Sequence, residues 1–196
     1  MKQETVSRIL ALLRRSMPKR SEISAAIGPV VIIATVLFAV QIYCDFAGYS
    51  IIAMGAAKVL GIDLMENFVA PYYAQSVTEF WRRWHISLSS WFRDYLYFPL
   101  GGSKKGKVRK QLNRMVVFLT SGLWHGAQIS YIVWGALNGL FQVVGDGLKP
   151  VREKIIKILQ LNQNSAGHKV LRIVCTFTLI CFTWIFFRAD GMQQAI

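Results

Sequence analysis

A histidine set among apolar residues is the first side chain of this sequence suited to chemistry. His125 lies within Ser121–Ala127 (SGLWHGA), inside a run, 115–144, that contains no Asp, Glu, Lys or Arg. An ionisable group at membrane depth is costly and is therefore a functional candidate. Burial disfavours the imidazolium, and a neutral ring can take a proton from a hydroxyl. The pattern equally allows a buried histidine that is hydrogen-bonded to a carbonyl.

The second candidate group is the run Glu79–His85 (EFWRRWH). Glu79 and Arg83 are four residues apart and can form an ion pair on a helix, while tryptophans are typical of the membrane interface. Arg82 and Arg93 could instead bind phosphates of a donor or of lipid headgroups, because guanidinium groups match phosphate geometry. The spacing alone favours the structural interpretation.

Asp45 is the third candidate, because it ends the first uncharged run. A lone carboxylate there could cap a helix or pair with an arginine, and a structural role is favoured over a functional one. The three cysteines and three histidines show no metal-binding spacing, so no metal site is predicted. The sequence also lacks a nucleophile elbow, a P-loop and a dinucleotide fingerprint.

The elements that position these residues are predicted to be membrane helices. Of the 196 residues, 54% are hydrophobic, and the mean hydropathy is +0.37, which is high for a soluble domain of this length. The net charge of +13 lies in blocks between apolar runs. This distribution favours cytoplasmic loops over nucleic-acid binding. We expect the blocks at 1–20, 104–114 and 149–157 to face the cytoplasm.

The first part of the chain is predicted to contain a basic amphipathic arm, 1–27, followed by a membrane domain, 28–196. Residues 28–44 are uncharged and suffice for about one crossing, which needs roughly 17–25 residues. The segment 46–50 indicates a break. The apolar piece after it, 51–60, is too short to span and is expected to pack on other helices.

The later elements are expected to be short, broken or interfacial helices. Residues 79–98 place aromatic side chains on one helical stripe, which is typical of a helix at the membrane interface. The uncharged run 115–144 is predicted to break at 122–126, and 170–187 forms the last apolar helix. The fold class is therefore all-α, a polytopic transmembrane helical bundle.

Several of these segments resemble one family, the membrane-bound O-acyltransferases, and within it the bacterial polysaccharide branch. The resemblance covers approximately residues 40–190, and its longest part runs from Pro71 to Gly102. The matching segments are Glu79–Ser89 (EFWRRWHISLS), Trp91–Tyr97 (WFRDYLY), Leu123–Gly126 (LWHG), Asp45–Ser50 (DFAGYS) and Trp184–Ala189 (WIFFRA).

The resemblance implies transfer of an acyl group to a hydroxyl in a tunnel through the membrane, with His125 as the catalytic residue. It implies an acyl thioester such as acetyl-coenzyme A as donor and no bound cofactor. The acceptor would be a polysaccharide at a bacterial cytoplasmic membrane, with membrane lipid around the protein and a partner acyltransferase or export proteins. The residues expected to line the tunnel or bind substrate are His85, Arg82, Arg93, Trp124, Asp45 and Asn138.

The sequence departs from the family pattern in two details and in length. Family members often carry an acidic residue at the position of Ile51 and a histidine at that of Asn138. They are also longer, so we expect this chain to be a partial core with little activity alone. The alternatives left open are a membrane conduit or scaffold for a partner transferase, and the D-alanyl transfer branch acting on teichoic acid. A channel or transporter is disfavoured, because the apolar runs largely lack paired charges.

Overall fold

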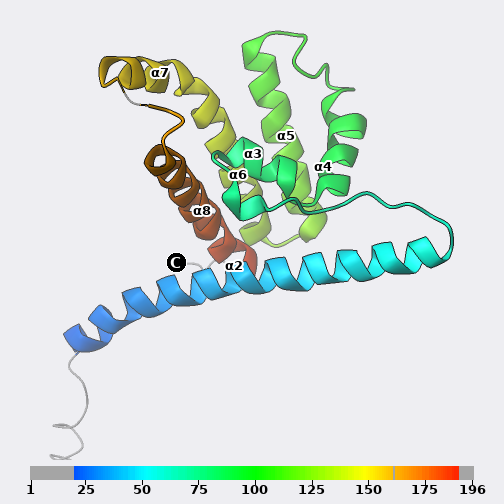
Figure 1. Ribbon diagram of the computed structural model, residues 1–196, viewed down its shortest axis with the longest axis horizontal. Coiled ribbons are helices and arrows are strands. Elements are labelled where there is room, and N and C mark those ends of the chain that lie inside the picture. Colours follow the sequence, from blue (N-terminus) through cyan, green and yellow to red (C-terminus); the bar gives the residue numbers. More distant parts are fainter. Residues whose placement is uncertain (1–19, 161, 190–196) are drawn as a thin grey trace, which may run out of the picture. The chain divides into compact units, whose positions relative to one another are not determined.

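The computed structural model describes residues 20–160 and 162–189, and in this part of the chain every regular element is a helix (Figure 1). A single isolated bridge joins Phe68 to Trp84. The prediction of an all-α fold is thus confirmed. The chain divides into two compact units, 1–38 and 39–196, and the candidate site lies within the second. Most of the predicted basic arm, 1–27, lies outside the described residues.

The first described helix, α2, runs without interruption over Arg20–Val59. The predicted break at 46–50 is therefore wrong, because a single glycine costs a helix only about 1 kcal/mol and does not by itself end it. The expected packing of 51–60 is also wrong for the described residues, since Ile51 and Ile52 are 68% and 73% exposed. The apolar part, Gly28–Val59, is long enough to cross a bilayer.

The aromatic and arginine-rich segment forms three short helices instead of the single helix predicted for 79–98. These are α3 (Val77–Arg83), α4 (Ile86–Phe92) and the π-helix η2 (Arg93–Tyr97), and the 3-10 helix η1 (Pro71–Tyr73) precedes them. The chain breaks at His85, which has a left-handed backbone with φ 47°. Because of this break the predicted stripe divides, with Phe80 and Trp84 buried and Trp91 and Tyr95 exposed.

Hydrogen bonds at its first turn explain where α3 begins. The Ser76 hydroxyl accepts from the backbone N–H of Glu79 at 3.1 Å, and the Glu79 carboxylate accepts from the backbone N–H of Gln75 at 2.8 Å. Such reciprocal bonds satisfy donors that a helix start leaves free. The predicted ion pair is confirmed, with Arg83 Nη2 at 2.6 Å from Glu79 Oε1.

Two helices of 19 residues each, α5 (Lys107–His125) and α6 (Ile129–Gly147), form an antiparallel hairpin. The predicted break in 115–144 is confirmed at Gly126, whose φ of +154° favours glycine. Residues 107–114, which we predicted as loop, are instead the first two turns of α5. Salt bridges from Lys110 and Arg114 to Asp146 show that the start of α5 lies against the end of α6.

Glycines allow α5 and α6 to approach closely. A Cβ atom on Gly122 would lie 2.4 Å from the carbonyl oxygen of Tyr131, and one on Gly135 would lie 2.3 Å from that of Phe118. Gly135 and Gly139 are four residues apart, the spacing that small residues use in close helix pairs in membranes. The middle parts of α5 and α6 therefore pack with their backbones in direct contact.

The last helices are α7 (Lys149–Ile158) and α8 (Ala166–Arg188). α8 contains the predicted last apolar run and is long and apolar enough to cross a membrane. It packs on α6 and α3 through a cluster of aromatic rings. Trp84 lies 5.3 Å from Trp184 between ring centroids, and Trp184 lies 6.2 Å from Trp134 in a stacked arrangement. This cluster joins α3, α6 and α8 into one core.

Replacing Gly135 with alanine should destabilise the protein by roughly 1–3 kcal/mol, the usual cost of overpacking, because the new Cβ meets the backbone of α5. Gly145 lies on the same helix with nothing within 4 Å of an added Cβ, so Gly145→Ala is the matched control and should be neutral or slightly stabilising. Thermal melts followed by tryptophan fluorescence in detergent would measure both. Equal melting temperatures for the two variants would contradict the close packing.

Candidate active site

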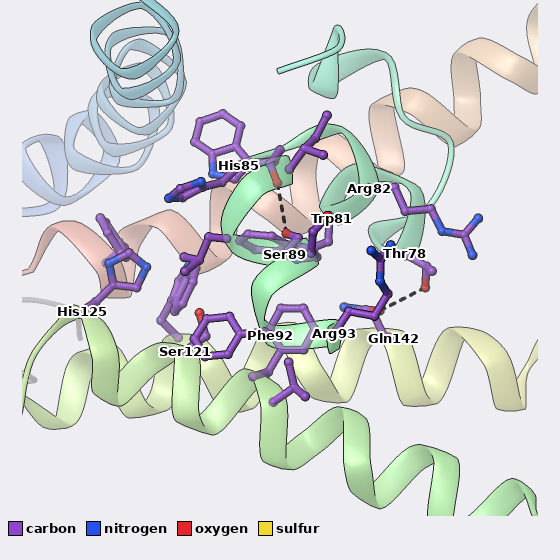
Figure 2. Close-up of a pocket in the computed structure, with 18 of the residues that line it drawn as sticks. Thr78, Trp81, Arg82, His85, Ser89, Phe92, Arg93, Ser121, His125 and Gln142 are labelled. Carbon is purple, nitrogen blue, oxygen red and sulfur yellow. Dashed lines mark hydrogen bonds between the residues drawn. The ribbon is translucent and has the colours of Figure 1, made fainter. Parts of the chain in front are cut away.

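A cavity of about 510 Å³ in the second unit lies between α3, α4, α5, α6 and the end of α8. Eight of its lining residues are Phe or Trp and four are aliphatic, and the polar side chains come from two histidines, two arginines, four hydroxyl residues and one amide. Figure 2 shows His125 at one end of this lining and Arg82 and Arg93 toward the other. The polar lining residues are Thr78, Arg82, His85, Ser89, Ser90, Arg93, Ser121, His125 and Gln142.

His125 is the last residue of α5 and is half-buried among rings. Its imidazole meets Trp134 and Phe187 edge to face, with centroids 5.2 and 5.0 Å away. Within residues 20–160 and 162–189 we find no hydrogen bond to either ring nitrogen. The alternative of a histidine bonded to a carbonyl is thus not observed there. Packing therefore fixes the ring plane, and the nitrogens remain available to a ligand in the cavity.

His85 faces the same cavity from the break between α3 and α4. The Asn67 side chain braces this break by accepting from the Ser87 backbone N–H at 3.0 Å and from its hydroxyl at 2.6 Å. Phe46 packs edge to face on the imidazole at 4.6 Å. Burial, together with the nearby His125, lowers the pKa of His85 to about 4. His85 is therefore a neutral group at physiological pH.

Two side-chain hydrogen bonds attach α3 to α6 along one edge of the cavity. The Trp81 indole N–H donates to Asn138 Oδ1 at 3.1 Å, and the Asn138 amide donates to the Trp134 carbonyl at 2.9 Å. One turn further along α6, Gln142 Oε1 accepts a hydrogen bond from the Thr78 hydroxyl at 3.3 Å. Asn138 is fully buried, and its hydrogen bonds stabilise the wall of the cavity by linking α3 to α6.

A second cavity, of about 400 Å³, shares Arg82, Ser89, Arg93 and Val117 with the first. Its other lining residues are Tyr97, Ser103, Lys110 and Arg114. Asp146 lies beside it, 2.9 Å from both Lys110 Nζ and Arg114 Nη1. Burial raises the pKa of Asp146, but hydrogen bonds from Lys110 and Arg114 outweigh this effect and bring it to about 2. The carboxylate is thus ionised at neutral pH.

The structure brings four of the predicted residues together, since Arg82, His85, Arg93 and His125 all line the first cavity. The remaining three lie elsewhere. Asn138 is buried behind Trp81, while Trp124 touches the His125 ring with a 5.0 Å centroid distance but is 59% exposed. Asp45 is exposed in the middle of α2, so it caps no helix end, and among the described residues it forms no ion pair with an arginine either.

The sequence analysis missed Trp134 and Gln142, which line the first cavity. With the predicted Asn138 between them they recur every four residues and place one aromatic and two amide groups on the same face of α6. That spacing on an otherwise apolar helix is a detectable signal for a functional or buried polar face. Lys110 and Arg114 were noted only as a basic block, because nothing in the sequence pairs them with Asp146 or with Arg82.

These features define a membrane-embedded helical protein with a histidine-containing cavity enclosed by its helices. The family model of the membrane-bound O-acyltransferases matches residues 7–188. The chain therefore belongs to the membrane-bound O-acyltransferase family, and the predicted resemblance is confirmed.

Curated relatives agree with this assignment. The chain is 44% identical over 158 residues to a probable alginate O-acetylase AlgI from Pseudomonas fluorescens, covering 81% of this chain and 30% of that protein. It is 36% identical to a peptidoglycan O-acetyltransferase from Helicobacter pylori, covering 81% and 29%. It is 33% identical to a teichoic acid D-alanyltransferase from Bacillus subtilis, covering 76% and 39%. The chain thus spans only about a third of the length of these relatives.

The ion pairs of Asp146 predict a pH-dependent contribution to stability. Because its pKa is about 2 in the folded protein and 3.8 otherwise, the contribution is present above pH 3.8 and is lost as the pH falls toward 2. Asp146→Asn should therefore melt at a lower temperature than wild type at pH 7, and the difference should shrink at pH 3. Thermal melts at the two pH values test this, and an undiminished difference at pH 3 would show that charge is not the cause.

Proposed function

We propose that the protein is an O-acyltransferase that moves an acetyl group from a thioester donor to hydroxyls of a cell-surface polysaccharide, with His125 as general base. The observation that carries the proposal is the position of His125 in the cavity wall, with its ring held by Trp134 and Phe187 and its nitrogens unpaired among the described residues. A neutral imidazole placed in this way suits proton abstraction from a hydroxyl.

In the proposed reaction, one proton moves from the acceptor hydroxyl to His125 and then from His125 to the leaving thiolate. His125 takes the proton of the acceptor hydroxyl as its oxygen attacks the thioester carbonyl carbon. The resulting tetrahedral intermediate collapses with breakage of the carbon–sulfur bond, and the imidazolium returns the proton to the thiolate. The Trp134 indole N–H is buried without an acceptor in the described part of the chain, which makes it a candidate donor to the developing oxyanion.

The charge of the cavity supports an acetyl group over a D-alanyl group. Among the described lining residues there are two guanidinium groups and no carboxylate. The ammonium of a D-alanyl group would have no counterion there, whereas a neutral acetyl group needs none. Aromatic walls of this kind also exclude water, which would otherwise hydrolyse the thioester. The higher identity to the alginate relative than to the D-alanyl relative points the same way.

The names of the relatives suggest the acceptor class. Alginate and the glycan strands of peptidoglycan are both polysaccharides found outside the cytoplasmic membrane, so we place this protein in a bacterial cytoplasmic membrane as a multi-pass component. The apolar stretches Gly28–Val59 and Ala166–Arg188 support membrane insertion by their length and composition. A partner acyltransferase or export proteins would carry the product onward.

The competing hypothesis is a non-catalytic conduit or scaffold for a partner transferase. In that case His125 would serve only to fill space among the aromatic rings. Substitution by alanine would then be tolerated, while changes in the α3–α4 segment would disrupt partner binding.

The test is the O-acetyl content of surface polysaccharide in cells that lack the gene for this protein, complemented with the complete gene. Wild type should restore acetylation. His125→Ala, present at the same level in the membrane, should reduce it about 100-fold or more, the range of general-base catalysis. His168→Ala is a matched control, because His168 is also a histidine but lies at the start of α8 and lines neither cavity.

Each alternative result has a definite meaning. Restoration by both wild type and His125→Ala would make His125 structural and would favour the conduit. Failure of both, with D-alanine missing from teichoic acid instead, would favour the D-alanyl branch.

A further inference from the structure

Helix α7 carries an apolar stripe that the described part of the chain leaves exposed. Five apolar side chains, three in the helix and two at its caps, follow the pattern i, i+3, i+7, i+10 and i+11. On a helix with 3.6 residues per turn they fall within an arc of ~100°. All five are between 48% and 68% exposed, so the stripe is available to an apolar partner. The stripe consists of Leu148, Val151, Ile155, Ile158 and Leu159.

The other sides of α7 have different surroundings. Ile156 is only 8% exposed and lies about 110° around the helix from the middle of the stripe, so this side faces the rest of the unit. Glu153 and Lys157 are exposed and lie roughly opposite the stripe, whereas Arg152 and Lys154 lie at its two borders. The helix therefore presents a packed side, an apolar side and a charged side in three separate directions.

The place of α7 in the chain puts it at one surface of the membrane. It connects the end of α6 to the start of α8 (Figure 1), and α8 is long and apolar enough to cross. The 10 residues of α7 extend only about 15 Å, half of the roughly 30 Å hydrocarbon core, so this helix is too short to cross. Its basic residues favour the cytoplasmic side. A short helix with an apolar stripe at such a surface lies in the plane of the membrane.

The charges beside the stripe fit anionic lipid. Within the described residues no carboxylate pairs with Arg152 or Lys154, because Glu153 lies beside Lys149 instead, at 4.0 Å. Long basic side chains at the border of an apolar stripe can keep their methylene groups in apolar surroundings and extend their charged ends to the headgroups. The cytoplasmic leaflet attracts such side chains through its anionic lipids. Charge complementarity therefore favours a lipid surface over an apolar helix of another protein, which would supply no counterions.

We propose that α7 is an in-plane membrane anchor, whose apolar stripe inserts into the cytoplasmic leaflet while Arg152 and Lys154 bind anionic lipid headgroups. Because α7 joins α6 to α8, its depth in the leaflet sets the depth of both helices, and rings of these two helices hold His125. The inference goes beyond the proposed acyltransferase function and does not depend on it.

The first experiment measures the depth of the stripe in the complete protein, reconstituted in nanodiscs that contain phosphatidylcholine and phosphatidylglycerol. A spin label is attached at Ile155→Cys in the stripe or, as the matched control, at Glu153→Cys on the opposite side, with the other cysteines replaced by alanine. Oxygen, which dissolves in lipid, should reach the label at position 155, and a water-soluble nickel chelate should not. The label at position 153 should show the reverse preference.

The second experiment measures headgroup binding as the phosphatidylglycerol that the protein retains in native mass spectrometry. Lys154→Gln should reduce retention about fivefold, the contribution of one basic side chain close to an anionic surface. Adding Arg152→Gln should reduce it by at least about tenfold in total. Lys157→Gln is the matched control and should change retention less than about twofold, because this side chain lies away from the leaflet and is screened by salt.

Three results would overturn the anchor. A label at position 155 that neither reagent reaches would show that protein covers the stripe, either a partner or a further helix of a longer chain. A label there that the nickel chelate reaches would show that α7 stands clear of the membrane. Equal phosphatidylglycerol retention by the Lys154→Gln and Lys157→Gln variants would show that the border residues hold no headgroup.

The outcome is separable from that of the catalytic proposal. His125 precedes the start of α6, whereas α7 follows its end. His125→Ala should therefore leave both the depth of position 155 and the retention of phosphatidylglycerol unchanged. Loss of either property in this variant would contradict an anchor that is formed by α7 itself, whatever happens to acyl transfer.

Discussion

The backbone contact between α5 and α6 is the constraint on which the candidate site depends. Gly122 and Gly135 leave no room for a side chain between the helices, and the connection at Gly126 turns the chain immediately after His125. A larger residue at either position would separate the helices and move the end of α5. The direction of the His125 ring therefore follows from glycine packing in the hairpin and from the rings of α6 and α8 against it.

In the rest of the second unit, aromatic side chains lie near the histidines and charged side chains lie at the other end of the cavity. Trp84, Trp134 and Trp184 form a continuous aromatic wall behind the histidines, which lowers the local dielectric constant and strengthens any charge interaction inside. The Trp81–Asn138 hydrogen bond satisfies two polar groups of this wall internally, whereas the Trp134 indole N–H has no acceptor among the described residues. The cationic groups lie at the other end, where Asp146 offsets part of their charge.

Local rules predicted much of this arrangement. The Glu79–Arg83 pair follows from helical spacing, and the break near Gly126 follows from the length of an uncharged run that is too long for one crossing. The resemblance to the family singled out His125, which the residues alone left undecided. The arginines of the cavity were found because they stood among aromatic residues.

Features that depend on tertiary contacts were not predicted. The left-handed turn at His85 is stabilised by Asn67, which lies in a loop that carries no signal of its own. The continuity of α2 through 46–50 could not be predicted from the sequence, because glycine and serine occur both inside membrane-spanning helices and at breaks between helices. The role of Asn138 depends on Trp81, which is 57 residues away in sequence.

The central claim is that His125 moves the proton of the acceptor hydroxyl and does not merely fill space. The most direct measurement compares donor binding and acyl transfer in one purified preparation of a His125→Gln variant, which keeps the size of the side chain but removes its basicity. The account predicts donor binding close to that of wild type and transfer reduced about 100-fold or more. Transfer within a few-fold of wild type would contradict it.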